Sequence, residues 1–364
     1  MNKKLMAAAV AGALAIPAVA FAQSSVTLYG TIDTGIRNQS KVIDTSTTPA
    51  SDGTVTSMTD GLYRTNRWGM KGSEDLGGGL KANFKLEGQY SSDTGAGPSG
   101  GATFARSSWV GLSSGGNEFH LGRDYTVNFK MWGKYDPMGY NFTGMTPNVR
   151  FTAGVRSNNM VQASANFGSG GVMVDYALGE QIGSSSAGNR WGIGGHFNVA
   201  GVTVAGAYST TKNAAATGSQ KDTTIGASYA MNQFTFKLGY AQTKWDSNYG
   251  SNGGGANGGW YAPSATGQLD KARMIALGVG YAFSDRVVGR FGYYDIKSTG
   301  FAAADDGKSK DTVLAVDYHL SKRTTAYVEV DHTAMDGSAV GTPVDGRASN
   351  DGTTGLGVGI AHTF

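Results

Sequence analysis

Residues 80–87 read LKANFKLE, and their polarity alternates strictly along the chain. The first, third, fifth and seventh residues are apolar, whereas the residues between and after them are polar or charged. Successive side chains of a β-strand point to opposite faces of the sheet. The segment therefore predicts a strand with one apolar face and one polar face.

The same alternation recurs on both sides of this segment, through nearly the whole chain. It is clear in residues 26–37, 161–167, 190–199, 234–240, 314–320 and 355–364. The connections alternate between short turns, such as residues 77–79, and long polar loops, such as residues 247–269. Strands of about ten residues joined in this way are typical of an up-and-down barrel that crosses a membrane.

Length agrees with this interpretation, because the chain holds about sixteen alternating segments of the length that membrane strands need. The predicted fold is all-β: a transmembrane antiparallel up-and-down β-barrel of about 16 strands, which is wide enough to enclose a water-filled channel. A secreted β-sandwich also alternates, but it rarely needs so many strands in one unit. A solenoid would show a repeat motif, which we do not find.

The cost of burying charge in lipid assigns the two faces of each strand. Arg or Lys facing lipid near the bilayer midplane costs about 2–4 kcal/mol, so the polar parity must face the lumen. The predicted lumen residues are Arg37, Arg67, Lys71, Lys81, Lys85, Arg156, Arg190, Lys237, Arg286, Arg290, Asp33, Glu87, Asp175, Asp317 and Glu329. Arg106 breaks the pattern because it shares its parity with Val110 and Leu112. It lies either at a membrane boundary or next to a β-bulge.

Residues 125–150 read YTVNFKMWGKYDPMGYNFTGMTPNVR and do not alternate. Such a long connection inside a regular β protein is usually functional or disordered, and its aromatic residues and Met argue against disorder. We expect this segment to fold into the mouth of the barrel and to narrow it. An ordinary packed surface loop is the alternative.

Residues 1–22 have the features of a secretory signal peptide, with Lys3 and Lys4, an Ala-rich apolar run, and a small-residue cleavage site ending at Ala22. A membrane helix is the alternative, but Gly12 and Pro17 interrupt the run. The predicted mature domain spans residues 23–364. Removing the two lysines leaves 28 basic and 27 acidic residues, a formal charge of +1. Such a chain is a poor nucleic-acid binder.

The sequence offers little for catalysis or metal binding. It has no Cys, which excludes thiolate metal sites. None of the five His lies at metal-ligand spacing, and no nucleophile elbow or phosphate loop is present. Asp305 and Asp306 could hold a cation weakly, but a solvated loop is the preferred interpretation. We therefore predict no enzyme, no cofactor and no metal; an outer-membrane barrel hydrolase, with a site assembled from distant strands, is the alternative of a different class.

Several stretches resemble the trimeric general diffusion porins of Gram-negative bacteria, of the neisserial and betaproteobacterial type. They are SSVTLYGTIDTGI at 24–36, NRWGMKGSEDLGGGLKANFKLEGQY at 66–90, ARSSWVGLSSGGNEFHLGRDYT at 105–126, VRSNNMV at 155–161 and VGIAHTF at 358–364. The resemblance implies a multi-pass barrel of the cell outer membrane, a homotrimer, and a third loop folded inward. Arg67 and Arg156 match inward arginines of the anion-preferring members, whereas Ala105 replaces another. Phe364 resembles the signal read by the barrel-assembly machinery.

The function we predict is passive diffusion of ions and small hydrophilic solutes, with mild anion preference. Arg67 and Arg156 would form one wall of the constriction, and Asp136 with its neighbours on the loop would form the other. Further cations would add a positive field: Arg37, Lys71, Lys81 and Lys85 on the strands, and Lys130, Lys134 and Arg150 on the loop. A substrate-specific porin is the nearest alternative.

Overall fold

The computed structural model describes residues 25–44, 51–97, 101–143, 154–249, 269–303, 306–337 and 351–364. The predicted signal peptide, residues 1–22, and residues 144–150 of the long aromatic segment lie outside these ranges. Within them, no helix is long and apolar enough to cross a membrane.

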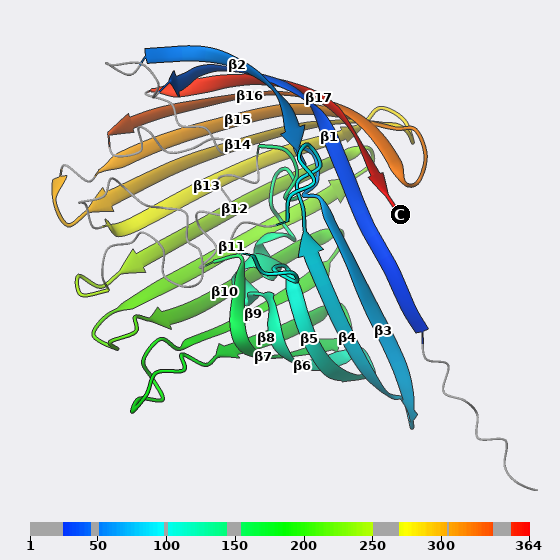
Figure 1. The fold of residues 1–364 in the computed structure, drawn as a ribbon, viewed down its shortest axis with the longest axis vertical. Helices are drawn as coiled ribbons and strands as arrows, with labels where there is room; N and C mark the ends of the chain where they lie inside the picture. The colour runs from blue at the N-terminus through cyan, green and yellow to red at the C-terminus, as the bar shows by residue number, and fades with distance from the viewer. Residues whose placement is uncertain are drawn as a thin grey trace, which may run out of the picture.

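Antiparallel strands account for most of the described chain, and they close into a ring (Figure 1). Each strand from β3 onward pairs with the next, and β17 pairs back to β1. The strands are β1 (Ser25–Asp44), β2 (Ser51–Asp60), β3 (Arg67–Gly77), β4 (Leu80–Gln89), β5 (Ser107–Ser114), β6 (Asn117–Tyr125), β7 (Arg156–Phe167), β8 (Gly170–Ala177), β9 (Arg190–Val199), β10 (Val202–Lys212), β11 (Ser219–Met231), β12 (Phe234–Trp245), β13 (Leu269–Ala282), β14 (Val287–Gly300), β15 (Gly307–His319), β16 (Thr324–Gly337) and β17 (Gly352–Thr363).

The closed sheet corresponds to a sixteen-stranded barrel although seventeen strands are assigned, because β2 and β3 pair one after the other with the same edge of β1. The first part of β1, up to Thr31, pairs with β3, and its continuation from Thr34 pairs with β2. The other edge of β1 pairs with β17. The predicted barrel is therefore confirmed.

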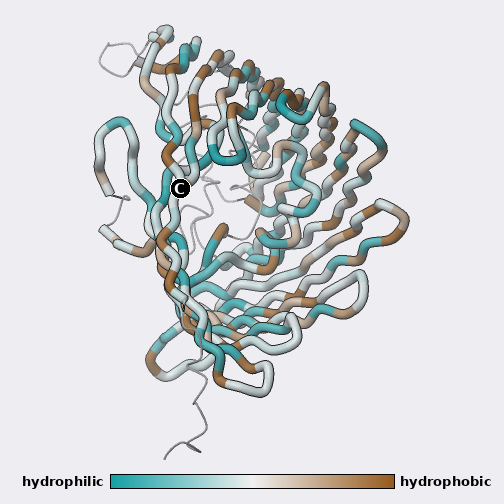
Figure 2. The backbone as a smooth tube through the Cα atoms, turned by 90° about the vertical axis from the view of Figure 1, so that its right-hand side faces the viewer, coloured by the Kyte–Doolittle hydropathy of each residue, from teal (hydrophilic) through white to brown (hydrophobic). Residues whose placement is uncertain are grey.

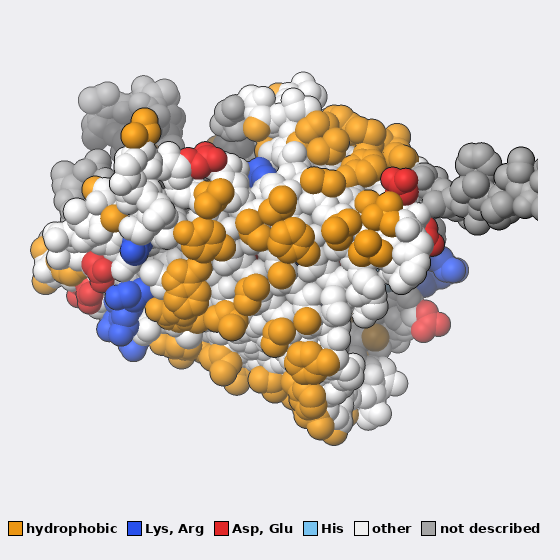
Figure 3. Space-filling model, turned by 90° about the horizontal axis from the view of Figure 1, so that it is seen from below, with side chains coloured by type: hydrophobic (Ala, Val, Ile, Leu, Met, Phe, Trp, Pro, Cys, Tyr) orange, Lys and Arg blue, Asp and Glu red, His pale blue; other side chains and the backbone are white. Residues whose placement is uncertain are grey.

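Hydrophilic and hydrophobic residues follow one another along the strands, as the sequence pattern predicts (Figure 2). The apolar residues of the alternating pattern lie on the outside of the barrel, where Leu238 and Leu314 are each 53% exposed. Hydrophobic side chains gather over the outer face in Figure 3, and charged groups lie mostly towards its ends. The inner face buries polar residues instead, including Asp33, Glu87, Asp175, Arg190, Asp222, Asp317 and Glu329. This division suits a wall between hydrocarbon and water.

Short turns join the strands at one end of the barrel, and two of them use runs of glycine at positive φ. The turn after β3 has Gly77, Gly78 and Gly79 at φ of 87°, 62° and 81°. The turn after β5 has Gly115 and Gly116 at 59° and 82°. Glycine adopts this region without the Cβ penalty of other residues, so these runs fix the tight hairpins.

The segment after β6 packs against the inner face of the barrel. It begins with the helix α2 (Val127–Trp132), whose N-cap Thr126 accepts a hydrogen bond from the Phe129 N–H at 3.3 Å. Helix α2 contacts β9, β10 and β11. The rest of the segment continues along the wall, where the peptide N–H and hydroxyl of Thr143 donate to the buried Glu329 carboxylate on β16.

A series of inward glycines makes room for this segment. A Cβ added at Gly239 would lie 2.7 Å from the ring of Trp132, and one at Gly278 would lie 2.7 Å from Pro137. The same holds for Gly194 against Met131, Gly226 against Tyr135, and Gly292 against Met138. The main hydrophobic cluster therefore lies inside the barrel, between the segment and the wall.

Candidate pore constriction

A cavity of about 330 Å³ lies between the barrel wall and the inward segment. Four arginines reach it from four places in the chain. Arg64 comes from the connection after β2, Arg67 begins β3, Arg106 precedes β5, and Arg156 begins β7. The remaining lining residues are Thr65, Tyr125, Phe129, Gly139, Tyr140 and Asn141.

Tyr125, the last residue of β6, holds two of these arginines in place. Its hydroxyl accepts hydrogen bonds from Arg106 at 2.6 Å and from Arg156 at 2.9 Å. The guanidinium carbon of Arg156 also lies 4.5 Å from the centre of the Tyr125 ring. Attraction between a cation and an aromatic face orients the guanidinium while leaving its positive charge intact.

Arg106 reaches the cavity through a local irregularity in strand pairing. Ser107 is the register partner of Glu87, yet the Arg106 N–H also donates to the Glu87 carbonyl at 3.0 Å. Two residues therefore face one, which is the arrangement of a β-bulge. The side chain points inward, where Nε lies 2.7 Å from the Glu87 carboxylate. Of the two explanations that the sequence left open for Arg106, the bulge is the one observed.

Three of the four arginines have no acidic partner in the part of the chain that the structure describes. Among the described residues, no carboxylate oxygen lies within 4.0 Å of Arg64, Arg67 or Arg156. Arg106 differs because Glu87 pairs with it. Arginine stays protonated at all working pH values, so this cavity carries a permanent excess of positive charge.

The arginines share the cavity lining with neutral aromatic residues. The rings of Tyr125 and Phe129 stack at 5.0 Å, and those of Phe129 and Tyr140 stack at 4.0 Å. The Tyr140 hydroxyl donates to the Phe129 carbonyl at 2.5 Å. Burial and nearby Asp136 raise the pKa of Tyr140 well above its usual range, so its phenol stays uncharged.

Asp136 does not form the acidic wall that we predicted from the sequence. Its side chain is fully buried and accepts hydrogen bonds from the Tyr294 hydroxyl at 3.0 Å and the Tyr140 N–H at 2.6 Å. Trp132 Nε1 donates to it at 3.3 Å, and Lys237 Nζ donates to its main-chain carbonyl at 2.7 Å. Asp136 therefore fixes the segment to β14 through its carboxylate and to β12 through its main-chain carbonyl, and the carboxylate does not face water.

Arg37 also departs from its predicted role. It is buried and donates to the Asp331 carboxylate at 2.7 and 2.9 Å, with Glu329 at 3.7 Å. Two carboxylates thus surround one guanidinium, and Arg37 does not line the arginine cavity. Its charge holds the wall together at β16 and adds little to the field in the channel.

The predicted lysines also lie apart from the arginine cavity. Lys71 and Lys85 line a separate cavity of about 300 Å³ towards the short-turn end, and Lys85 lies 3.3 Å from Glu87. Lys81 is exposed next to the turn after β3. Lys134 lies on the inward segment, where burial lowers its pKa.

Sequence reasoning missed Arg64, Tyr125 and Tyr140 as parts of this site. Arg64 lies in a connection between strands, where alternation does not indicate which way a side chain points. The tyrosines belong to the segment that we expected to enter the barrel, but their partners depend on contacts between distant strands. No group of three or more His, Asp or Glu in the described part of the chain is placed to hold a metal ion.

Comparison with known proteins agrees with this architecture. The family model described as Gram-negative porin matches residues 7–338. Outer membrane porin protein 32 of Delftia acidovorans is 31% identical over the whole of both chains, and an outer membrane porin protein of Bordetella pertussis is 30% identical, also over both. An anion-selective porin from Comamonas acidovorans has a similar structure, with a TM-score of 0.72 and 27% identity over 94% of this chain and 100% of that one. The chain belongs to the Gram-negative porin family.

Proposed function

We propose that this outer-membrane barrel is a water-filled channel for passive diffusion of ions and small hydrophilic solutes, with a preference for anions. The observation that carries the preference is the group formed by Arg64, Arg67 and Arg156, which face one cavity without an acidic partner among the described residues. The anion-selective porin with a similar fold supports the same direction. The family and the fold point to a channel and not to an enzyme.

The inward segment acts as the constriction in this proposal. Residues 126–143 occupy space along the inner wall from β8 to β16, which narrows the passage beside the arginines. An anion that passes the guanidinium groups exchanges part of its hydration shell for their N–H donors. No tight complex forms, because the donors are exposed on one side to the water column.

Two further features belong to this proposal. The homotrimer implied by the resemblance predicts three chains per particle, which native mass spectrometry in detergent can count.

Phe364 is proposed as an assembly signal; its N–H donates to the Gly30 carbonyl at 3.1 Å, and its carbonyl accepts from the Gly30 N–H at 3.2 Å.

Reversal potentials in planar bilayers test the function. Folded protein in a KCl gradient should give ohmic steps and a reversal potential of the sign that chloride preference dictates. A potential of the opposite sign would contradict the arginine argument. Absence of conductance from folded protein would contradict the channel itself, and block by micromolar amounts of one solute would favour a substrate-specific porin.

A further inference from the structure

The backbone pairing of the barrel wall is interrupted beside Asp33. On one edge of β1, β3 pairs with residues up to Thr31, and β2 pairs with residues from Thr34 onward. The registers of these strands, which the structure describes in full, leave Ile32 and Asp33 without a partner strand on that edge. Unpaired main-chain N–H and C=O groups buried in a wall cost free energy, so another group has to satisfy them.

The side chain of Asn66 fills this interruption. The Asp33 N–H donates to the Asn66 side-chain oxygen at 2.5 Å, and the Asn66 amide nitrogen donates to the Asp33 carbonyl at 3.0 Å. One side-chain amide thus reproduces the pair of hydrogen bonds that a partner strand would make. The same nitrogen also donates to the Asp60 carboxylate at 2.6 Å, and Asn66 is completely buried.

The connection between β2 and β3, residues 61–66, turns from this point into the lumen, and we call it the elbow. Gly61 begins the turn with a φ of 80°, and a Cβ added there would lie 2.7 Å from the Arg64 carbonyl oxygen. Leu62 is buried against Gly357 on β17, where an added Cβ would lie 2.4 Å from the leucine side chain. The two neighbours of Gly357 are exposed on the outer face, so the contact with Leu62 lies inside the barrel.

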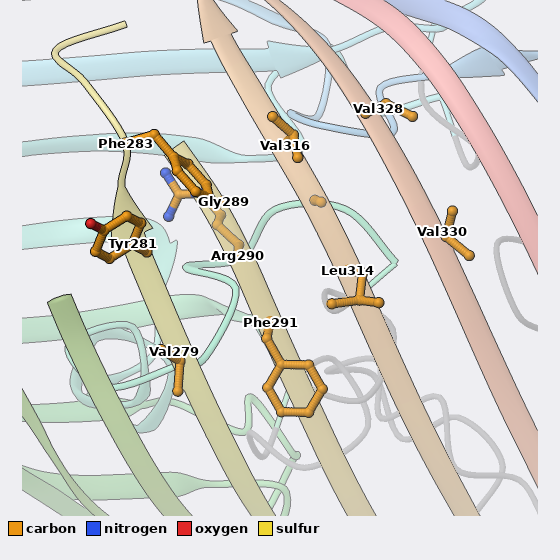
Figure 4. Close-up of a pocket in the computed structure, with 11 residues that line it drawn as sticks. Val279, Tyr281, Phe283, Gly289, Arg290, Phe291, Leu314, Val316, Val328 and Val330 are labelled. Atoms are coloured by element: carbon orange, nitrogen blue, oxygen red, sulfur yellow. The ribbon is translucent and has the colours of Figure 1, made fainter. Parts of the chain in front are cut away.

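Aromatic packing joins the elbow to the inward segment. On β16, Val328 lines an apolar groove of about 400 Å³ on the outer face (Figure 4), so the neighbouring Tyr327 points to the lumen. There Tyr63 of the elbow stacks on Tyr327 at 5.4 Å and contacts Phe142 of the inward segment at 5.0 Å. Phe142 packs edge-on against Tyr327 at 5.7 Å. The elbow and the inward segment therefore share one aromatic cluster.

The Asp33 carboxylate ties this cluster to the main chain of the elbow. One of its oxygens accepts a hydrogen bond from the Tyr327 hydroxyl at 2.7 Å, and the other accepts one from the N–H of Arg64. Together with the bonds to Asn66, these contacts hold the elbow at two points. Such anchors are needed because Arg64 enters a cavity that three other arginines line, and like charges repel one another.

We propose that the elbow is a second constriction element beside residues 126–143, and that Asn66 is the positioning residue that keeps the Arg64 guanidinium at the cavity. This inference rests on the anion-preferring channel proposed above and adds the means by which one of its charges is held. Arg64 and Thr65 line the arginine cavity together with residues 139–141 of the inward segment. Asn66 is buried and does not line the cavity, so it acts on a passing ion only through Arg64.

A double-mutant cycle in planar bilayers tests the positioning role. The four folded, full-length proteins are wild type, Arg64→Gln, Asn66→Ala and the double variant, and the measured quantity is the chloride-to-potassium permeability ratio. One unit of charge at the edge of a cavity of this size changes the ratio about threefold, so Arg64→Gln should lower it by that factor. Asn66→Ala should lower it equally, because the released elbow takes Arg64 away from the cavity.

The double variant distinguishes positioning from a general structural role. If Asn66 acts through Arg64, the double variant should fall no further than Arg64→Gln alone. Two independent effects would instead multiply to about ninefold. A ninefold fall in the double variant would overturn the proposal, as would a wild-type ratio in folded Asn66→Ala.

Two control variants accompany the cycle. Asn198→Ala removes an amide that also makes two hydrogen bonds, to Ser169 and Thr203, at the short-turn end, and it should keep the wild-type ratio. Asn66→Ala combined with Arg156→Gln should fall about ninefold, because Tyr125 and not the elbow holds Arg156. A fall of only threefold in that combination would show that Asn66 acts on the whole cavity, and the specific link to Arg64 would be lost.

A single thiol tests the elbow without any change to Asn66, and it decides the matter should Asn66→Ala fail to fold. The chain contains no Cys, so Arg64→Cys carries one thiol. Its thiolate takes the alkylthio group of a methanethiosulfonate reagent and releases methanesulfinate, which attaches a positive or a negative charge according to the reagent. The cationic product should raise the permeability ratio about threefold over unmodified Arg64→Cys, and the anionic product should lower it about threefold. Equal ratios after both modifications, each verified by mass spectrometry, would place residue 64 away from the ion path and overturn the proposal.

The wild-type recording separates this inference from the channel proposal. Folded wild type without conductance, or with cation preference, would reject the channel proposal itself. Anion preference in wild type that folded Asn66→Ala retains in full would reject the positioning role alone. Heat-modifiable gel mobility establishes that each variant is folded.

Discussion

Charge at the arginine cavity should set the ratio of anion to cation permeability. The size of this electrostatic effect can be calculated from the structure. A cavity of about 330 Å³ corresponds to a sphere about 4 Å in radius, which places a lining guanidinium about 6 Å from an ion at its centre. At that distance in water, one unit charge contributes about 0.7 kcal/mol, and physiological salt screens this to about 0.3 kcal/mol.

The two ions of KCl feel this potential with opposite signs, so each unit of charge changes their relative barrier by about 0.65 kcal/mol. Arg156→Gln should therefore lower the chloride-to-potassium permeability ratio about threefold. Arg67→Glu combined with Arg156→Glu changes the charge by four units, or about 2.6 kcal/mol. That corresponds to roughly 80-fold and should reverse the selectivity.

Reversal potentials across a tenfold KCl gradient measure this ratio directly. Lys322→Gln is the matched control, because it removes one exposed cation far from the cavity and should leave the ratio unchanged. Heat-modifiable gel mobility establishes that each variant is folded. A folded double variant that keeps the selectivity of wild type would refute the reasoning, since it would place Arg67 and Arg156 away from the ion path.

Three other changes test the inward segment. Glu329→Ala removes the acceptor of Thr143, so the segment should loosen, and single-channel recordings should show raised conductance and open-channel noise; an unaltered trace would contradict the anchoring role. Gly239→Val places methyl groups against the Trp132 ring and should push the segment into the lumen, lowering conductance, whereas the matched change Gly280→Val meets only Thr235 and should not. Because desolvation lowers the pKa of Lys134, its charge is lost at a lower pH than that of an ordinary lysine. Anion preference should accordingly begin to decline at a pH below 10.5, the ordinary pKa of lysine, and Lys134→Arg should reduce that decline; identical pH profiles would exclude a contribution from Lys134.

Much of the fold follows from the sequence because alternation is a local property. Residues 80–87 and 234–240 indicate their lipid-facing side without knowledge of any partner strand. The sequence also predicts that residues 125–150 fold inward, because their aromatic residues and Met argue against disorder. The residues of the candidate site were harder to predict from the sequence. The sequence predicts that Asp136 and Arg37 line the channel, because it shows only their charge and their position in the alternating pattern. Their burial depends on Tyr294 and Asp331, which lie more than a hundred residues away along the chain. A bulge, which shifts parity by one residue, hid the direction of Arg106.

Pairing, more than the number of charges, decides the field inside this barrel. The inner face holds many carboxylates, but those that are buried are engaged: Asp331 by Arg37, Asp124 by Lys130, Asp317 by Arg290, and Asp33 by the Tyr327 hydroxyl. The arginines of the cavity are held by neutral groups, chiefly the ring and hydroxyl of Tyr125. A tyrosine that orients a guanidinium leaves its charge available to a passing ion, whereas a carboxylate would cancel it. A chain of nearly balanced charge can therefore line its narrowest part with positive potential. Tyr125→Phe should then preserve anion preference while loosening Arg156, and a loss of preference equal to that of Arg156→Gln would show that the hydroxyl, and not the guanidinium alone, sets the field.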